Sequence, residues 1–165
     1  MINKIIWLLL AALFANSTFA ADNYSIYLVR HAEKQKDVEN PGLTRCGQAR
    51  AKQLASLLSQ AKISKVYSTS YQRTQQTASP LAIKQHIAVQ NYNPKHLEQL
   101  SIQLQKRKEN SLVVGHSNTT PQLAEFLSKQ KMAPLTEQDY QQLYQIQFIG
   151  VEKIVTLFKQ PLICQ

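Results

Sequence analysis

The alternation of short apolar runs with amphipathic stretches is the feature that most constrains how this chain can fold. Four short runs rich in β-branched or aromatic residues predict strands, at residues 24–30, 65–69, 87–89 and 111–115. Stretches with apolar residues at helical spacing follow them and predict helices, at residues 44–61, 71–84, 94–108 and 119–129. Strands joined by helices pair in parallel, so we expect an α/β domain whose mainly parallel central sheet is covered on both faces, a three-layer α/β/α sandwich.

The end of the chain departs from this alternation. Residues 143–149 and 153–158 alternate apolar and polar side chains and are joined at Gly150, which predicts a C-terminal hairpin at the edge of the sheet. Two prolines bear on the predicted helices. Pro121 suits the first turn of the helix at 119–129, whereas Pro80 should perturb the helix at 71–84. The length of 165 residues and the 44% apolar content suit one globular domain and exclude collagen-like, disordered and solenoid classes.

Residues 1–20 have the pattern of a cleavable secretory signal. Lys4 precedes an apolar run at residues 5–15, and small residues lie just before Ala21, where we expect the cut. A membrane span needs roughly 20 apolar residues, so this run is too short to be a stable membrane anchor. We therefore expect a signal peptide at 1–20, a folded domain at 21–165, and a periplasmic or secreted location.

Export also bears on the two cysteines, Cys46 and Cys164. An oxidising compartment permits a disulfide between them, and two separate thiols fit the sequence slightly better because it gives no distance. Neither cysteine has the spacing of a zinc site, so we expect no metal.

The charge is strongly positive, with 19 Lys and Arg against 10 Asp and Glu. Basic residues are scattered, and their only tight run, at residues 106–108, is typical of a solvated helix end. No nucleic-acid-binding motif accompanies them, so we expect no nucleic acid partner. The excess charge instead favours anionic small substrates or an anionic surface.

Polar motifs follow three of the predicted strands: Arg30-His31-Ala32-Glu33, residues 68–73 ending in Arg73, and Gly115-His116-Ser117-Asn118. The carboxyl ends of parallel strands meet at one edge of a sheet, where ligands bind. Two arginines and two histidines in one crevice suit a compact dianion, because guanidinium groups match phosphate oxygens. Histidine adds a nitrogen that is nucleophilic when neutral and a donor when protonated.

These residues resemble the histidine phosphatase superfamily, also called phosphoglycerate mutase-like. Four blocks carry the resemblance in the family's order over residues 24–127: 28–34, 43–51, 67–78 and 113–119. The resemblance implies the phosphoglycerate mutase-like fold and a metal-independent phosphatase without a cofactor, which hydrolyses phosphate monoesters through a phosphohistidine intermediate.

The resemblance also implies roles for individual residues. His31 matches the nucleophile, and Arg30, Arg73 and His116 match the groups that hold the phosphoryl oxygens. Ser117 and Asn118 precede a helix N-terminus, where they would bind the substrate anion or simply cap the helix. For Thr44 and Gly47 we expect a helix cap and close packing.

The general acid is not settled by the resemblance. One branch has Asp directly after the second histidine, where this chain has Ser117. The mutase-like branch takes a Glu from the region before that histidine, which favours Glu98. Glu33, two residues after His31, is the other candidate, and neither carboxylate need be the acid.

The sequence thus predicts an exported phosphatase acting on a phosphorylated small molecule or an envelope glycan. The alternatives are a noncatalytic phosphate- or polyanion-binding envelope protein and an interaction protein that uses its net charge. His86 and His96 have polar neighbours and are expected on the surface, and Asp139-Tyr140 is expected to make a structural hydrogen bond.

Overall fold

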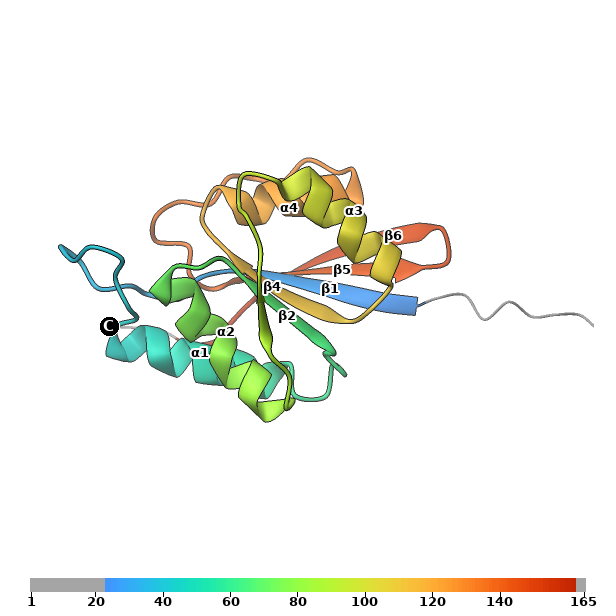
Figure 1. The fold of residues 1–165 in the computed structure, drawn as a ribbon. Helices are drawn as coiled ribbons and strands as arrows, with labels where there is room; N and C mark the ends of the chain where they lie inside the picture. Colours follow the sequence, from blue (N-terminus) through green and yellow to red (C-terminus); the bar gives the residue numbers. More distant parts are fainter. Residues whose placement is uncertain (1–22, 163–165) are drawn as a thin grey trace, which may run out of the picture.

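The computed structural model describes residues 23–162, which form one six-stranded sheet between two pairs of helices (Figure 1). The strand order is β3-β2-β4-β1-β5-β6. The first four strands in this order are parallel, and β5 and β6 run antiparallel to their neighbours. The predicted signal peptide, its cut before Ala21, and Cys164 lie outside the described residues.

The strands bring distant parts of the chain together. Strand β1 (Asn23–Arg30) lies between β4 (Ser111–Gly115) and β5 (Gln142–Ile149). Strand β2 (Lys65–Ser68) lies between β4 and the short β3 (Val89–Asn91). Strand β6 (Glu152–Lys159) completes the hairpin at the edge. The parallel pairing puts the carboxyl ends of β1, β2 and β4 at the same edge of the sheet.

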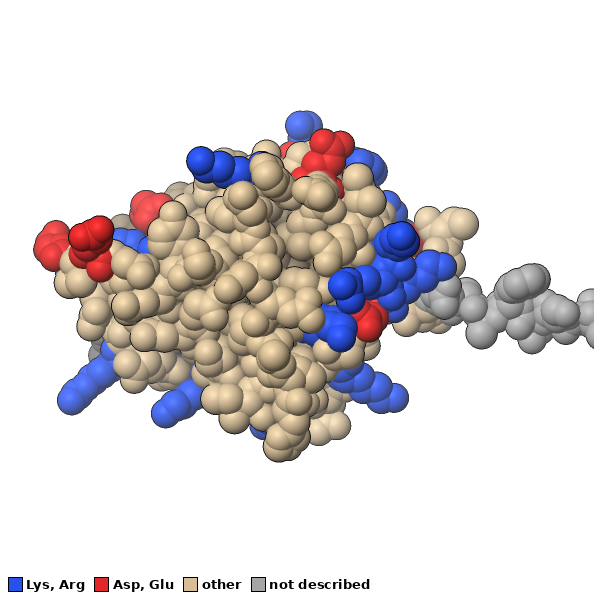
Figure 2. Space-filling view, in the orientation of Figure 1, with Lys and Arg blue, Asp and Glu red and all other residues tan. Residues whose placement is uncertain are grey.

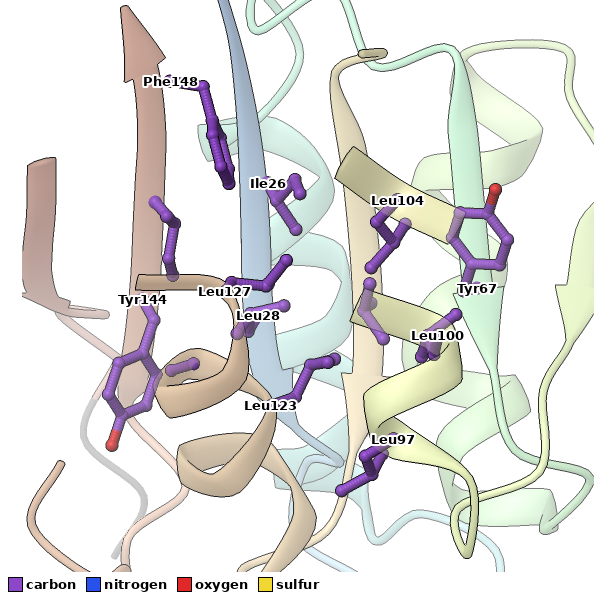
Figure 3. Close-up of a cluster of buried hydrophobic side chains, with 13 residues drawn as sticks. Ile26, Leu28, Tyr67, Leu97, Leu100, Leu104, Leu123, Leu127, Tyr144 and Phe148 are labelled. Atoms are coloured by element: carbon purple, nitrogen blue, oxygen red, sulfur yellow. The ribbon is translucent and has the colours of Figure 1, made fainter. Parts of the chain in front are cut away.

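Each face of the sheet carries two helices. Helices α1 (Arg45–Leu57) and α2 (Gln72–Lys84) cover one face, and α3 (Leu97–Arg107) and α4 (Thr119–Ser128) cover the other (Figure 1). The core beneath α3 and α4 contains Ile26 and Leu28 of β1 (Figure 3), whereas Val29 faces the other core. Because both faces are buried, the central strands have continuous apolar runs rather than alternation. The predicted three-layer α/β/α sandwich with a C-terminal edge hairpin is confirmed.

Four local expectations differ from the structure. Helix α1 ends at Leu57 rather than at 61, because the chain turns there and the Ala61 amide donates to the Leu58 carbonyl at 3.1 Å. Strand β3 occupies 89–91 rather than 87–89, because the Ile87 amide donates to the Ala82 carbonyl and closes the preceding helix. Helix α3 begins at Leu97 rather than at 94, because the Asn93 side chain accepts from the Lys95 amide and holds a turn. Pro80 does not interrupt α2, which continues to Lys84.

The start of α1 is fixed against the loop that follows β1. The Thr44 hydroxyl oxygen accepts from the Gly47 amide at 3.1 Å, which satisfies one of the free donors of the first turn. A Cβ on Gly47 would collide with the backbone carbonyl of Glu33. The expected cap and close packing are confirmed.

Leu162, near the C-terminal end of the described residues, packs against α1. The Leu162 carbonyl accepts from Arg50 at 3.2 Å, and the Leu162 amide donates to the Gln53 side chain, also at 3.2 Å. Cys46, in the first turn of α1, is disulfide-bonded, so the slight preference for free thiols is wrong for this residue.

Lys and Arg side chains gather near the C-terminal end of α3 (Figure 2). The basic run at 106–108 is exposed there, at the end of the sheet where the parallel strands begin, opposite their carboxyl ends. The Arg107 guanidinium and the Lys65 ammonium lie 3.9 and 4.0 Å from the Glu109 carboxylate, distances at which surface ion pairs contribute little. The expected solvated helix end is confirmed. Within 23–162, no helix is both long and apolar enough to cross a membrane.

Candidate active site

A pocket of about 380 Å³ opens at the carboxyl ends of β1 and β4. The His31 amide, one residue beyond β1, donates to the Gly115 carbonyl at 2.9 Å, so the sheet pairing places His31 beside His116. Arg73 reaches the same pocket from the first turn of α2. The pocket is lined by Arg30, His31, Lys34, Tyr71, Arg73, Pro94, Lys95, His116, Ser117, Asn118, Thr119 and Glu137.

His31 is held as a neutral imidazole. Its side chain is almost fully buried, and burial lowers its pKa to about 3, helped by the positive charges of Arg30 and Arg73. Its Nδ1 atom lies 2.8 Å from the Ala32 carbonyl oxygen. Because a carbonyl only accepts, Nδ1 must carry the proton and donate, which leaves the lone pair of Nε2 free. A neutral imidazole with a free Nε2 is a nucleophile.

His116 faces His31 across the pocket, with 5.6 Å between the ring centroids. Its Nε2 lies 3.2 Å from the hydroxyl oxygen of Thr69, which is fully buried and bonded in turn to the Thr74 hydroxyl at 2.8 Å. Burial, with the charge of Arg73 second, lowers the pKa of His116 to about 4. Thr69 thus orients His116, a role that the sequence motif did not single out.

The two arginines supply the positive charge. Arg30 is almost fully buried and its guanidinium lies 4.3 Å from the centre of the Tyr140 ring, and Arg73 stacks similarly on Tyr71 at 4.4 Å. Burial lowers the pKa of Arg73, and the charge of Arg30 acts in the same direction. Within the described part of the chain, the buried Nε atoms of both arginines have no hydrogen-bond partner. Unpaired guanidinium donors at a pocket indicate an anion site.

A loop between α4 and β5 closes one side of the pocket. Arg30 donates to the Thr136 carbonyl and to the Glu137 carboxylate, both at 2.8 Å. The Ser117 hydroxyl donates to the other carboxylate oxygen of Glu137 at 3.0 Å. This hydrogen bond and the charge of Arg30 lower the pKa of Glu137. Glu137 lies far from the other site residues in sequence and outside any motif, so no local signal identified it.

The same loop is held by Asp139. Its Oδ2 atom accepts from both the amide and the hydroxyl of Thr136, each at 2.7 Å. The structural hydrogen bond expected at Asp139-Tyr140 is thereby confirmed, while the Tyr140 ring packs against Arg30.

The structure brings most of the predicted site residues to one pocket: Arg30, His31, Arg73, His116, Ser117 and Asn118. The Asn118 side chain makes no capping hydrogen bond to α4, although Asn118 is its N-cap residue. His86 and His96 are exposed, as expected.

The two candidate acids do not line this pocket. The Glu33 carboxylate accepts from Arg50 Nε at 2.9 and 3.0 Å and pairs with the Arg50 terminal nitrogen at 2.6 Å. Glu98 is exposed in the first turn of α3 and lines an adjoining pocket of about 410 Å³, which shares Pro94 and Lys95 with the first. Over residues 23–162, no group of three His, Cys, Asp or Glu side chains is placed to hold a metal ion.

Comparison with known proteins identifies relatives of this fold. The family model for the histidine phosphatase superfamily (branch 1) matches residues 26–94, a range that includes Arg30, His31 and Arg73. A search of curated protein sequences finds no match.

Several solved structures share the fold at low sequence identity. The protein histidine phosphatase SixA, complexed with tungstate, is 13% identical over 82% of this chain and 97% of its own, with a TM-score of 0.67. A mycobacterial glucosyl-3-phosphoglycerate phosphatase is 12% identical over 83% of this chain and 98% of its own, with a TM-score of 0.62. A phosphoserine phosphatase from Entamoeba histolytica, in complex with 3-phosphoglyceric acid, is 14% identical over 82% and 96%, with a TM-score of 0.58.

The family match confirms the resemblance over the blocks at 28–34, 43–51 and 67–78, and the solved structures confirm the expected fold.

Proposed function

We propose that this chain is a histidine phosphatase that hydrolyses phosphate monoesters through a phosphohistidine on His31. One observation carries the proposal: a neutral His31 with a free Nε2 lies in a pocket that the buried Arg30 and the partly buried Arg73 make positive. His31 is the nucleophile, and the two arginines bind the dianionic phosphoryl group that it attacks.

The reaction follows from this geometry in two steps. Nε2 of His31 attacks phosphorus, the ester P–O bond breaks, and the leaving oxygen takes a proton. Nδ1–H keeps its hydrogen bond to the Ala32 carbonyl, which stabilises the positive charge that the ring gains. Water then attacks phosphorus and breaks the P–N bond, which releases phosphate and restores neutral His31.

The arginines and His116 stabilise the charge on the transferring phosphoryl group. Their donors are fixed before the substrate binds, since Arg30 is held by Thr136 and Tyr140 and His116 by Thr69. Such preorganised charge is the main contribution of a protein to phosphoryl transfer. We therefore propose a mechanism without a metal or another cofactor, whose rate persists in excess chelator.

The natural substrate belongs, in this proposal, to the phosphorylated small molecules or envelope glycans rather than to nucleic acids. We also propose export, with a cut before Ala21 and no stable membrane anchor. The disulfide bond of Cys46 supports this location, because disulfides persist in oxidising compartments. The N-terminal sequence of the protein recovered from the periplasm of a Gram-negative host tests it, and an uncut chain in the cytosol would contradict it.

Replacement of His31 by Ala separates catalysis from binding. The variant loses the nucleophile but keeps Arg30, Arg73 and His116, so turnover of an aryl phosphate should fall by roughly 10³-fold or more. Phosphate binding, measured by calorimetry, should weaken far less. His86→Ala, which removes an exposed imidazole, is the matched control.

Rapid quenching of the wild type with labelled substrate should trap an acid-labile, base-stable adduct on His31. An adduct on serine, or wild-type turnover by His31→Ala, would refute the mechanism. A wild type that binds phosphate and hydrolyses no ester would instead identify the noncatalytic phosphate-binding protein.

A further inference from the structure

The mouth of the pocket carries a single carboxylate. Among the described residues that line the pocket, only Glu137 is acidic. Its carboxylate bridges two groups expected to bind the phosphoryl oxygens, with one oxygen 2.8 Å from Arg30 and the other 3.0 Å from the Ser117 hydroxyl. The Glu137 side chain is 74% exposed, whereas that of Arg30 is 1% exposed, so Glu137 lies on the outer side of Arg30.

The leaving group must depart on this outer side. In phosphoryl transfer the attacking and leaving atoms lie roughly in line through phosphorus. The attacking nitrogen belongs to His31, which is buried at the base of the pocket, so the ester oxygen points towards the solvent. A carboxyl group that reaches Arg30 from the solvent side lies beside a phosphoryl group held by the same guanidinium.

We propose that Glu137 donates the proton to the leaving oxygen, an inference that rests on the proposed phosphatase function. As His31 Nε2 forms its bond to phosphorus, the ester P–O bond breaks and its electron pair takes the proton from the Glu137 carboxyl. The alcohol leaves neutral and Glu137 is left as carboxylate. In the second step that carboxylate takes a proton from the attacking water, which restores the acid.

Substrate binding supplies the protonated form. In the free protein, the Ser117 hydrogen bond and the Arg30 charge hold the pKa of Glu137 down. A bound phosphoryl group takes over the donors of Arg30 and Ser117 and adds negative charge beside the carboxylate. Both changes favour the neutral carboxyl group, which takes up a proton from solvent or from the monoester monoanion.

Neither acid candidate from the sequence is placed for this role. Glu33 is engaged by three nitrogen contacts to Arg50, away from the pocket. Glu98 lines the adjoining pocket and not this one. His116 faces His31 and its Nε2 lies 3.2 Å from the Thr69 hydroxyl, a position that suits contact with the phosphoryl oxygens rather than with the leaving oxygen on the solvent side.

Leaving-group dependence tests the proposal. A dinitrophenolate leaves without protonation, whereas an alkoxide requires it. Glu137→Gln should therefore lower kcat/KM for alkyl phosphates by on the order of 10²–10³-fold and for a dinitrophenyl phosphate by less than about threefold. The alkaline fall of kcat with alkyl phosphates should disappear in this variant. Glu152→Gln, which removes one exposed carboxylate from the far end of the hairpin, is the matched control for charge and should leave both rates unchanged.

The other results would overturn the proposal. An equal loss on both ester classes would show that Glu137 only shapes the site. An equal gain on both, with tighter phosphate binding, would show that it only competes for Arg30. A leaving-group effect in Glu98→Gln instead would assign the acid there. Failure of the phosphatase function is distinct, since then the wild type hydrolyses neither ester class.

Discussion

Acidification from pH 7 to pH 5 should destabilise the folded protein because of its two buried imidazoles. In the folded chain the pKa is lowered to about 3 for His31 and to about 4 for His116, against an ordinary value of 6.5. Below pH 6.5 the unfolded chain therefore binds two protons that the folded chain does not bind. The contribution of the two neutral histidines to stability is fully present above pH 6.5. It is lost as the pH falls towards their pKa values in the folded chain.

The size of the loss follows from these values. Each pH unit below 6.5 costs about 1.4 kcal/mol for each histidine that stays neutral in the folded state. At pH 5 the almost fully buried His31 accounts for about 2 kcal/mol, and the half-buried His116 for less because solvent screens it. The free energy of unfolding should thus fall by roughly 2 to 4 kcal/mol between pH 7 and pH 5.

Urea denaturation followed by far-ultraviolet circular dichroism at pH 7, 6 and 5 measures this loss. A chain with both His31→Asn and His116→Asn should show a much flatter pH dependence. His86→Asn, which removes an exposed imidazole at the opposite end of α2, serves as the control. Equal unfolding free energies at pH 7 and pH 5 in the wild type, or an unchanged slope in the double variant, would refute the reasoning.

Three further predictions concern the supports of the site. Gly47→Ala forces a methyl group against the Glu33 backbone and should cost about 1 to 3 kcal/mol of stability in urea denaturation, so an unchanged midpoint would contradict the packing. Arg50→Ala leaves the Glu33 carboxylate without its three nitrogen contacts and should cost about 3 kcal/mol by the same assay, whereas a loss below about 1 kcal/mol would mean that solvent replaces the pair. Thr69→Val removes the hydroxyl that orients His116 and should lower turnover of an aryl phosphate about tenfold. The comparison requires that urea denaturation shows the variant to be as stable as the wild type, and unaltered turnover would then exclude this role.

The layers of the fold were predictable because each central strand is buried on both faces. Val29, Val66 and the run at 111–115 can only be accommodated inside a covered sheet, and their spacing leaves room for one helix between strands. Apart from the uninterrupted helix at Pro80, the errors in the secondary structure lie at element ends. At these ends a single side-chain or backbone hydrogen bond decides where the element begins or ends, as the hydrogen bond to the Asn93 side chain does before α3.

The deep part of the site was predictable for a similar reason. Arg30 ends a predicted strand, and His31 and His116 directly follow predicted strands, so the parallel topology brings them together without knowledge of any contact. The roles of Glu137 and Thr69 could not be predicted in this way. Glu137 comes from an irregular loop whose path is set by Asp139 and Tyr140, and loop paths have no periodic sequence signal.

The place of β1 in the sheet has a consequence for how the protein is made. The strand that carries Arg30 at its end pairs only with β4 and β5, segments that leave the ribosome much later. Because β4 lies between β1 and β2, a nascent chain or a fragment that ends before residue 111 holds His31 and Arg73 but no strand to join them. Such long-range pairing makes folding slow. The pocket therefore forms only in the finished chain, and a protein cut between α3 and β4 should yield two inactive halves until they reassociate.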